Sequence, residues 1–170
     1  MEAPLYSADP TALAVTAKNW LKGMVAGFIA TVVLSALMLM KQGMGLVPQL
    51  NPIEDIAHVA DHLTGMTLPL PFAWIGHFVL GTVAWGIIYA ALQASLPGAP
   101  VVKGLIFGAL AWLAMMIFFT PLAGHGLFAL SLGPQATVAT LVLHLVYGAV
   151  LGEVYGLLAT KQSSAASYSR

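Results

Sequence analysis

Residues 21–40 read LKGMVAGFIATVVLSALMLM, an apolar run in which Lys22 is the single charged side chain. A helix needs roughly 20 residues to cross the ~30 Å hydrocarbon core of a membrane, so this run is long enough to span one. Three further apolar stretches have the same character, at residues 72–92, 104–119 and 136–160. They lack the alternation of barrel strands, so their backbone groups must be hydrogen-bonded within helices. The sequence therefore predicts an all-α, polytopic membrane protein with four transmembrane helices in one domain, residues 21–160.

Composition indicates the same class and excludes others. Charged residues make up 7% of the 170 residues, whereas soluble domains average about 25%. The formal net charge is zero and no run of Lys or Arg occurs, which excludes nucleic acid as a partner because phosphate contacts need clustered cations. The absence of cysteine excludes disulfides, iron–sulfur clusters and thiolate zinc sites. The lipid bilayer is the partner that this composition predicts.

The basic residues predict an orientation for the four spans. All but Lys41 fall on one side of a four-span arrangement, namely Lys18, Lys22, Lys103, Lys161 and Arg170. By the positive-inside rule both termini are then cytoplasmic, and residues 1–20 form an N-terminal cytoplasmic segment. Residues 161–170 are expected to be a mobile C-terminal tail. The loops at residues 41–71 and 121–135 then face the outer side of the membrane.

The two halves of the chain repeat each other. Lys22, Gly23 and Gly27 in the first half have the same spacing as Lys103, Gly104 and Gly108 in the second, and His77 with Gly81 has the same spacing as His144 with Gly148. Histidine is rare in this chain, so its recurrence with glycine four residues later carries more weight than the glycine matches. The repeat predicts two duplicated helical hairpins related by an axis along the membrane normal, with His77 and His144 at one depth.

Residues 51–64 are expected to form an additional helix between the first two spans. Asn51 suits the N-cap, Pro52 the first helical position and Glu54 the first turn. At about 100° per residue, one half of the helix is apolar and the other carries Glu54, Asp55, His58, Asp61 and His62. This pattern predicts an amphipathic helix lying flat on the outer membrane surface.

An ionisable side chain inside the bilayer is costly, so His77 and His144 are the first candidates for a functional site. On one interpretation they are the axial ligands of a b-type haem, and Gly81 and Gly148 leave room for the macrocycle. On another, each histidine makes a structural hydrogen bond across a helix interface and the glycines allow close packing. A different metal is the third interpretation. His125, which lies between two glycines in an uncharged outer loop, either folds over this site or is an incidental loop residue.

The outer helix offers a second candidate site. His58 and His62 are four residues apart, with Glu54 and Asp61 nearby, a spacing that suits Zn²⁺ or Cu²⁺. The alternative is an ordinary solvated polar face. Six methionines also fall toward the outer side: Met38, Met40, Met44, Met66, Met115 and Met116. Thioether with imidazole suits Cu(I), although methionine is equally a common apolar filler.

Glu153 is the only carboxylate within a predicted span. It follows His144 by nine residues (153 minus 144), which places it on the opposite side of the helix. We expect a structural hydrogen bond to a neighbouring span, with snorkelling to the surface or contact with a second subunit as alternatives.

Small residues at four-residue spacing predict close-packing faces on the first and fourth spans, within the monomer or between subunits. The leading functional hypothesis is therefore a non-catalytic accessory or scaffold subunit that docks against itself or a larger membrane complex. A protein that binds b-type haem, copper or zinc through its outer histidines is the alternative. A small transporter or channel is the third, and the spans offer it little polar path.

A set of residues carries a family resemblance: Trp74, Gly76, His77, Gly81, the segment 120–124 (TPLAG), the segment 126–128 (GLF), Leu143, His144, Tyr147, Gly148, Gly152, Tyr155 and Gly156. This pattern resembles an uncharacterised family of small four-span bacterial inner-membrane proteins, a domain of unknown function that is distantly similar to the YagU-like proteins. The resemblance covers roughly residues 20–160. It implies four spans and a bacterial inner-membrane location, and it transfers neither an activity nor a ligand.

Overall fold

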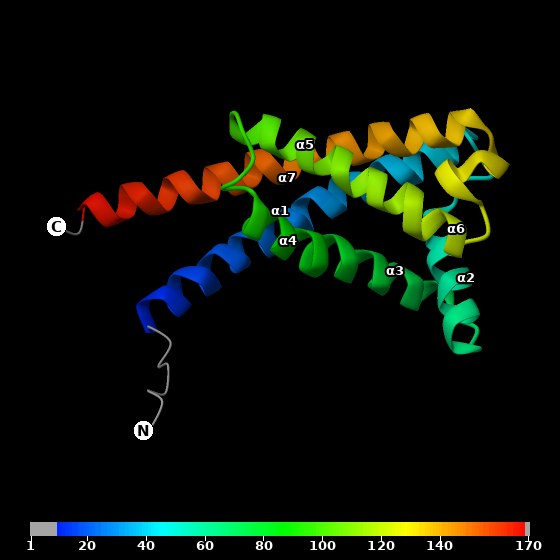
Figure 1. Ribbon diagram of the computed structural model, residues 1–170, viewed down its shortest axis with the longest axis horizontal. Helices are drawn as coiled ribbons and strands as arrows, with labels where there is room; N and C mark the ends of the chain where they lie inside the picture. Colours follow the sequence, from blue (N-terminus) through cyan, green and yellow to red (C-terminus); the bar gives the residue numbers. More distant parts are fainter. Residues whose placement is uncertain (1–9, 169–170) are drawn as a thin grey trace, which may run out of the picture.

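The computed structural model describes residues 10–168, and the side chains of residues 16–160. The described part is helical and contains no strand. Its elements are α1 (Pro10–Gly43), α2 (Pro52–Thr64), α3 (Leu70–Val79), the π-helical segment η1 (Leu80–Ala84), α4 (Trp85–Leu92), α5 (Pro100–Ala114), the π-helical segment η2 (Met115–Phe119), α6 (Thr120–Leu122), the 3-10 helix η3 (Leu127–Leu132) and α7 (Pro134–Tyr168). Figure 1 shows that α1 begins and α7 ends at the end of the molecule opposite α2.

Four helical segments are long and apolar enough to cross a membrane, which confirms the predicted class. They are Thr16–Gly43, Leu70–Leu92, Pro100–Leu122 and Pro134–Thr160. The third is longer than the predicted 104–119 because Pro100 starts the helix and η2 and α6 continue it. The predicted domain limits after residues 20 and 160 fall inside α1 and α7. An apolar run marks the part of a helix that suits hydrocarbon, and the helix itself continues until a cap or a breaker ends it.

The two long helices α1 and α7 pack against each other and form the centre of the bundle (Figure 1). Segments η1 and α4 of the second span pack on α1, and α5 of the third span packs on α7. A cluster of buried aromatic side chains, which includes Tyr89, Phe107 and Tyr155, joins the second span to the third and fourth at the end away from α2.

Glycines make the closest contacts in both pairs. The atoms nearest to a Cβ built on each glycine identify the glycines that face each other. Between α1 and the second span these are Gly23 with Gly86 and Gly27 with Gly81, and between α5 and α7 they are Gly104 with Gly152 and Gly108 with Gly148. At Gly27 such a Cβ would lie 2.7 Å from the Gly81 carbonyl oxygen, inside van der Waals contact. The small residues that the sequence marks as packing faces are therefore used inside the monomer, where they let helix backbones touch.

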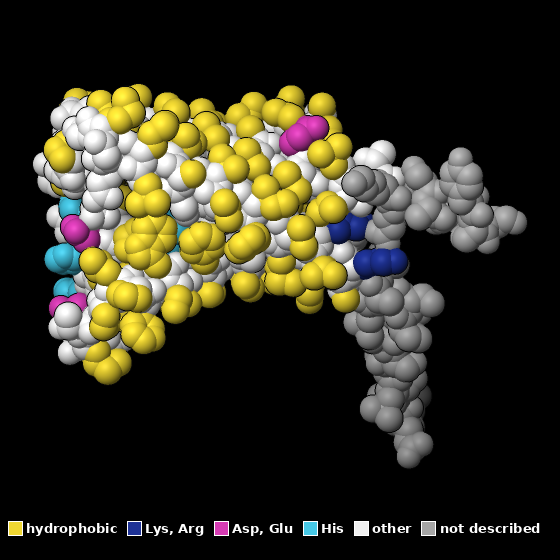
Figure 2. All heavy atoms as spheres, turned by 180° about the vertical axis from the view of Figure 1, so that it is seen from behind, with side chains coloured by type: hydrophobic (Ala, Val, Ile, Leu, Met, Phe, Trp, Pro, Cys, Tyr) yellow, Lys and Arg dark blue, Asp and Glu magenta, His cyan; other side chains and the backbone are white. Residues whose placement is uncertain are grey.

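The outer surface of the bundle is apolar along its length (Figure 2). Phe118, with 69% of its surface exposed, is one of many large apolar side chains that face outward. In Figure 2 the histidines and most acidic side chains gather at one end and the lysines that this view shows at the other, while Lys41 lies in the last turn of α1 near α2. We call the end with α2 and η3 the histidine end, and the end with Lys18, Lys22 and Lys103 the lysine end. An apolar belt between two polar ends is the surface expected of a protein that spans a bilayer.

Candidate functional site

A cavity of about 400 Å³ lies between the spans toward the histidine end. All four spans and α2 contribute to its wall, and the side chains with polar or sulfur atoms in it are Thr31, Met38, His77, Trp85, Met115, Thr140, His144 and Tyr147. The rest of the wall is mainly aliphatic and aromatic. Cavities of roughly 300–1,000 Å³ with apolar walls and a few polar groups are typical of small-molecule sites. We call this the histidine cavity.

His144 is held by its own helix. Its Nδ1–H donates a hydrogen bond of 2.8 Å to the carbonyl oxygen of Thr140, one turn earlier on α7. This bond fixes the neutral tautomer in which Nε2 carries a lone pair, and Nε2 has no partner among the described residues. An imidazole oriented by a backbone carbonyl in this way is the usual arrangement of a metal-ligating histidine.

His77 lines the cavity from α3, and its Nε2, unlike that of His144, has a hydrogen-bond partner. Its Nε2 lies 3.2 Å from the hydroxyl oxygen of Ser35 on α1. Its ring also makes edge-to-face contacts with Trp74 and Phe78, each with ring centroids 5.8 Å apart. The structure therefore brings both predicted histidines to one cavity, and it gives them different hydrogen bonds.

Both π-helical segments border the cavity. Leu80 and Gly81 of η1 and Met115 of η2 lie in its wall. The Gly81 carbonyl oxygen in η1 accepts a hydrogen bond of 2.6 Å from the Tyr147 hydroxyl, across the bundle on α7. Single π turns inside α-helices are rare and occur frequently at functional sites.

The two glycines that follow the histidines have separate places. Gly81 lines the cavity, where an added Cβ would collide with the Thr31 hydroxyl. Gly148 lies in the contact between α7 and α5, and an added Cβ there would collide with the Gly104 carbonyl oxygen. At both positions the space of the missing Cβ is already filled, by Thr31 of α1 at Gly81 and by α5 at Gly148, so neither glycine by itself makes room for a ligand.

Helix α2 covers the histidine cavity, and Pro52 and Ile56 lie in the cavity wall. Its start follows the predicted signals, with Pro52 in the first turn, and Gly65 ends it in the left-handed conformation at φ 70°. Ile53 is buried against Met38 and Ala73, which anchors the apolar side of α2 to the bundle.

One polar contact ties α2 to the loop after α6. His125 Nε2 lies 2.8 Å from the Asp55 carboxylate, and both side chains are largely buried. His125 is thus placed beside α2 and is absent from the cavity wall described above. Burial raises the pKa of Asp55 above its usual 3.8, and the hydrogen bond and charge of His125 act in the opposite direction. Two charged neighbours on α2 have smaller effects, since His58 lowers this pKa and Glu54 raises it.

Replacing His125 with alanine is expected to loosen α2 at neutral pH. A buried acceptor left without its donor costs about 1–3 kcal/mol, so hydrogen exchange of the α2 amides should speed up about tenfold. Loss of His125 also raises the pKa of Asp55 further, so the protonated form is favoured in the folded protein. In this variant the protonated Asp55 makes its whole contribution to the stability of α2 below pH 3.8, the pKa in the unfolded chain. This contribution is lost as the pH rises through the higher pKa of Asp55 in the folded protein.

The matched control for this prediction is the double variant His125→Ala/Asp55→Asn. It removes the charge that the loss of His125 leaves behind, so its exchange should vary little with pH. Equal exchange in wild type and His125→Ala at pH 7 would show that the contact does not hold α2.

The predicted outer metal residues lie on the exposed side of α2. Glu54, His58, Asp61 and His62 are all exposed. Across the part of the chain that the structure describes, no group of three or more His, Cys, Asp and Glu side chains could hold a metal ion. The zinc or copper site on α2 therefore stays a prediction without a third ligand from this chain.

Glu153 also lies apart from the histidine cavity. Its side chain is exposed on α7, and none of the hydrogen bonds found among the described residues involves it. It follows Gly152, which faces α5, so it points away from the contact between these helices. The expected hydrogen bond to a neighbouring span stays a prediction.

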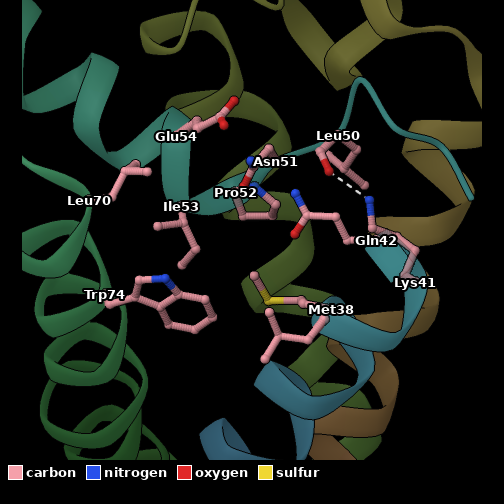
Figure 3. A pocket seen from close by; sticks show the side chains of 11 residues that line it. Met38, Lys41, Gln42, Leu50, Asn51, Pro52, Ile53, Glu54, Leu70 and Trp74 are labelled. Carbon is pink, nitrogen blue, oxygen red and sulfur yellow. Dashed lines mark hydrogen bonds between the residues drawn. The ribbon is translucent and has the colours of Figure 1, made fainter. Parts of the chain in front are cut away.

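A smaller cavity of about 190 Å³ adjoins the first at the histidine end, and Met38 and Pro52 line both. In Figure 3 the side chains of Met38, Ile53 and Trp74 face one another across it, and Glu54 extends away from them. Lys41 donates hydrogen bonds to the carbonyl oxygens of Leu50 (2.6 Å) and Val47 (3.0 Å). These bonds hold the turn between α1 and α2, and Lys41 and Leu50 both lie in the wall of the smaller cavity.

Fold and site together define a multi-pass, all-helical membrane protein with a largely apolar cavity that two histidines line. The chain belongs to a family of unknown function, DUF6789, whose profile matches residues 17–166. No curated protein and no solved structure matches the chain.

Proposed function

We propose that this protein binds b-type haem in the histidine cavity, with His144 as an axial ligand and His77 as the second. The observation that carries the proposal is the bond from His144 Nδ1–H to the Thr140 carbonyl, which leaves the Nε2 lone pair available in an apolar cavity. A quinone carbonyl would need a donor at this nitrogen, whereas iron needs a lone pair. The geometry therefore favours a metal centre over a carbonyl ligand.

The surroundings of the cavity also suit a flat, apolar cofactor. Aromatic side chains from three spans, Trp85, Phe119 and Tyr147 among them, lie in the wall with Leu34 and Leu143. Ligation by His77 would require its Nε2 to exchange the Ser35 hydroxyl for iron.

Copper(I) is the second candidate, and a specific observation favours it. Met38 and Met115 line the same cavity as His77 and His144. Two thioethers and two imidazoles form a soft ligand set that suits Cu(I) in a water-poor site. Haem and copper use the same histidines, and only copper uses the methionine sulfurs.

An accessory or scaffold function was the leading hypothesis from the sequence, and its argument rested on glycine-rich faces. The structure uses these faces inside the bundle, for example where Gly23 meets Gly86 and Gly104 meets Gly148. Docking to a second copy or to a larger membrane complex would then involve the exposed apolar belt. The histidine cavity provides the more specific chemistry, so ligand binding is proposed first.

The proposal includes two duplicated hairpins in a bacterial inner membrane, with the lysine end in the cytoplasm and α2 on the outer surface. The glycine contacts support the duplication, because Gly27–Gly81 and Gly108–Gly148 are equivalent pairs, as are Gly23–Gly86 and Gly104–Gly152. The collection of lysines at one end supports the orientation (Figure 2).

The experiment is an absorption spectrum of the protein purified in mild detergent from haem-replete cells, oxidised and then reduced with dithionite, with metal analysis of the same sample. A Soret band with a sharp reduced α-band and iron near one per chain is the expected result. A colourless protein with copper that falls in Met38→Leu/Met115→Leu would establish the second candidate. A protein with neither iron nor copper would refute both.

A further inference from the structure

A separate cavity of about 440 Å³ lies at the lysine end, between the ends of the four spans. It shares no lining residue with the histidine cavity. The residues that give it its character are Asn19, Lys22, Tyr89, Gln93, Lys103 and Tyr155. We call it the lysine cavity. None of the functions proposed above uses it.

The charge in this cavity is positive and unopposed within its wall. Lys22 Nζ donates a hydrogen bond to Asn19 Oδ1 at 3.3 Å, and Lys103 Nζ donates one to the Gln93 carbonyl oxygen at 2.9 Å. An ammonium group has three N–H donors, so each lysine retains donors for a ligand. The wall formed by the described residues contains no Asp or Glu. Glu153, the nearest acidic residue along α7, lies outside the wall and is exposed.

Two further features add to the attraction for an anion. Pro100, in the first turn of α5, lies in the wall, so the amino-terminal end of this 15-residue helix borders the cavity. That end of a helix carries unpaired N–H groups and partial positive charge. Tyr89 and Tyr155 stand edge to face with ring centroids 5.4 Å apart and close the cavity toward the bundle centre.

We propose that the lysine cavity binds the phosphate group of an anionic membrane lipid. The cavity lies where the apolar spans end, which is the level of lipid headgroups in a bilayer. Exposed apolar side chains adjoin its lining residues in the chain: Leu21 next to Lys22, Leu92 next to Gln93, and Leu157 next to Gly156. They offer contact to the acyl chains of a lipid whose phosphate lies between the lysines. Basic pockets between spans are a recognised mode of binding anionic lipids.

The test is native mass spectrometry of the full chain in detergent titrated with phosphatidylglycerol, comparing wild type with Lys22→Gln/Lys103→Gln. Each lysine near a membrane surface contributes about 1 kcal/mol, so the double variant should bind the lipid about 30-fold more weakly. Lys18→Gln is the matched control, because Lys18 is an exposed lysine at the same end and does not line the cavity. Lys22→Arg/Lys103→Arg should retain binding.

Three further outcomes decide the proposal. Equal binding of phosphatidylglycerol by wild type and the glutamine variant, with both eluting as folded, monodisperse protein, would overturn it. Equal loss in Lys18→Gln would overturn it as well, since the effect would then be one of general surface charge. Inorganic phosphate at millimolar concentration is expected not to displace the lipid; full displacement would identify a site for a free anion and overturn the lipid assignment.

Discussion

His144→Ala is expected to abolish the Soret band of the purified protein. The substitution removes the imidazole whose Nε2 is free for iron, and it leaves the α7 backbone and the Thr140 carbonyl in place. Loss of a residue that only orients a metal ligand typically costs about 10–100-fold in affinity, so loss of the ligand itself should cost more. The haem content after purification should therefore fall at least about tenfold below that of the wild type.

Two comparisons make this result specific. His62→Ala removes a histidine that is exposed on α2, and it should leave the spectrum unchanged. Imidazole added to His144→Ala should restore part of the band, because a small ligand can enter the space that the side chain leaves. Full haem content in His144→Ala would place the ligand elsewhere and contradict the proposed function. His77→Ala should keep haem more weakly, with a change from six- to five-coordinate iron in the spectrum.

Gly148→Val is expected to lower the stability of the bundle more than any surface substitution. An added Cβ at this position would collide with the Gly104 carbonyl oxygen and would lie 2.9 Å from the Gly108 Cα. Overpacking of a core usually costs about 1–3 kcal/mol when side chains can move aside. Here the obstacles are backbone atoms of α5, so α5 and α7 must separate, and a loss of at least about 3 kcal/mol is expected.

The measurement is thermal unfolding in detergent, where such a loss corresponds to a fall in Tm of roughly 10 °C. Gly43→Ala is the control, since an added Cβ at Gly43, at the end of α1, meets nothing within 4 Å. A Tm within the error of wild type would mean that α5 and α7 do not pack through this glycine.

The class of the protein and its spans could be predicted because they depend on local sequence. A membrane-spanning run such as residues 21–40 is recognisable without any tertiary contact. The start of α2 is equally local, because Pro52 suits the first turn of a helix and the apolar positions that follow repeat with a helical period. The histidine pair was found because an imidazole is costly in hydrocarbon wherever it lies in the bundle.

The parts that escaped prediction depend on residues far apart in the chain. His125 and Asp55 are 70 positions apart, and their contact exists only because the loop after α6 returns to α2. The role of Tyr147 as a donor to Gly81 requires two spans in register. Gly81 and Gly148 have the same spacing from a histidine, and both pack against a neighbouring helix, but only Gly81 also lines the histidine cavity. Spacing alone does not distinguish these two uses.

The π turn η1 has a geometric consequence for the two histidines. In α7, Gly148 and Gly152 face α5 four residues apart, whereas in the second span Gly81 and Gly86 face α1 five residues apart. The second span thus contains one residue more between its two packing contacts. One residue corresponds to about 100° of rotation about a helix axis, so the halves of the second span on either side of η1 differ in phase. The half with Gly86 can keep its contact with α1 while the half with His77 is turned independently. In this way two unlike imidazoles line one cavity, one bound to a hydroxyl and the other to a carbonyl of its own helix.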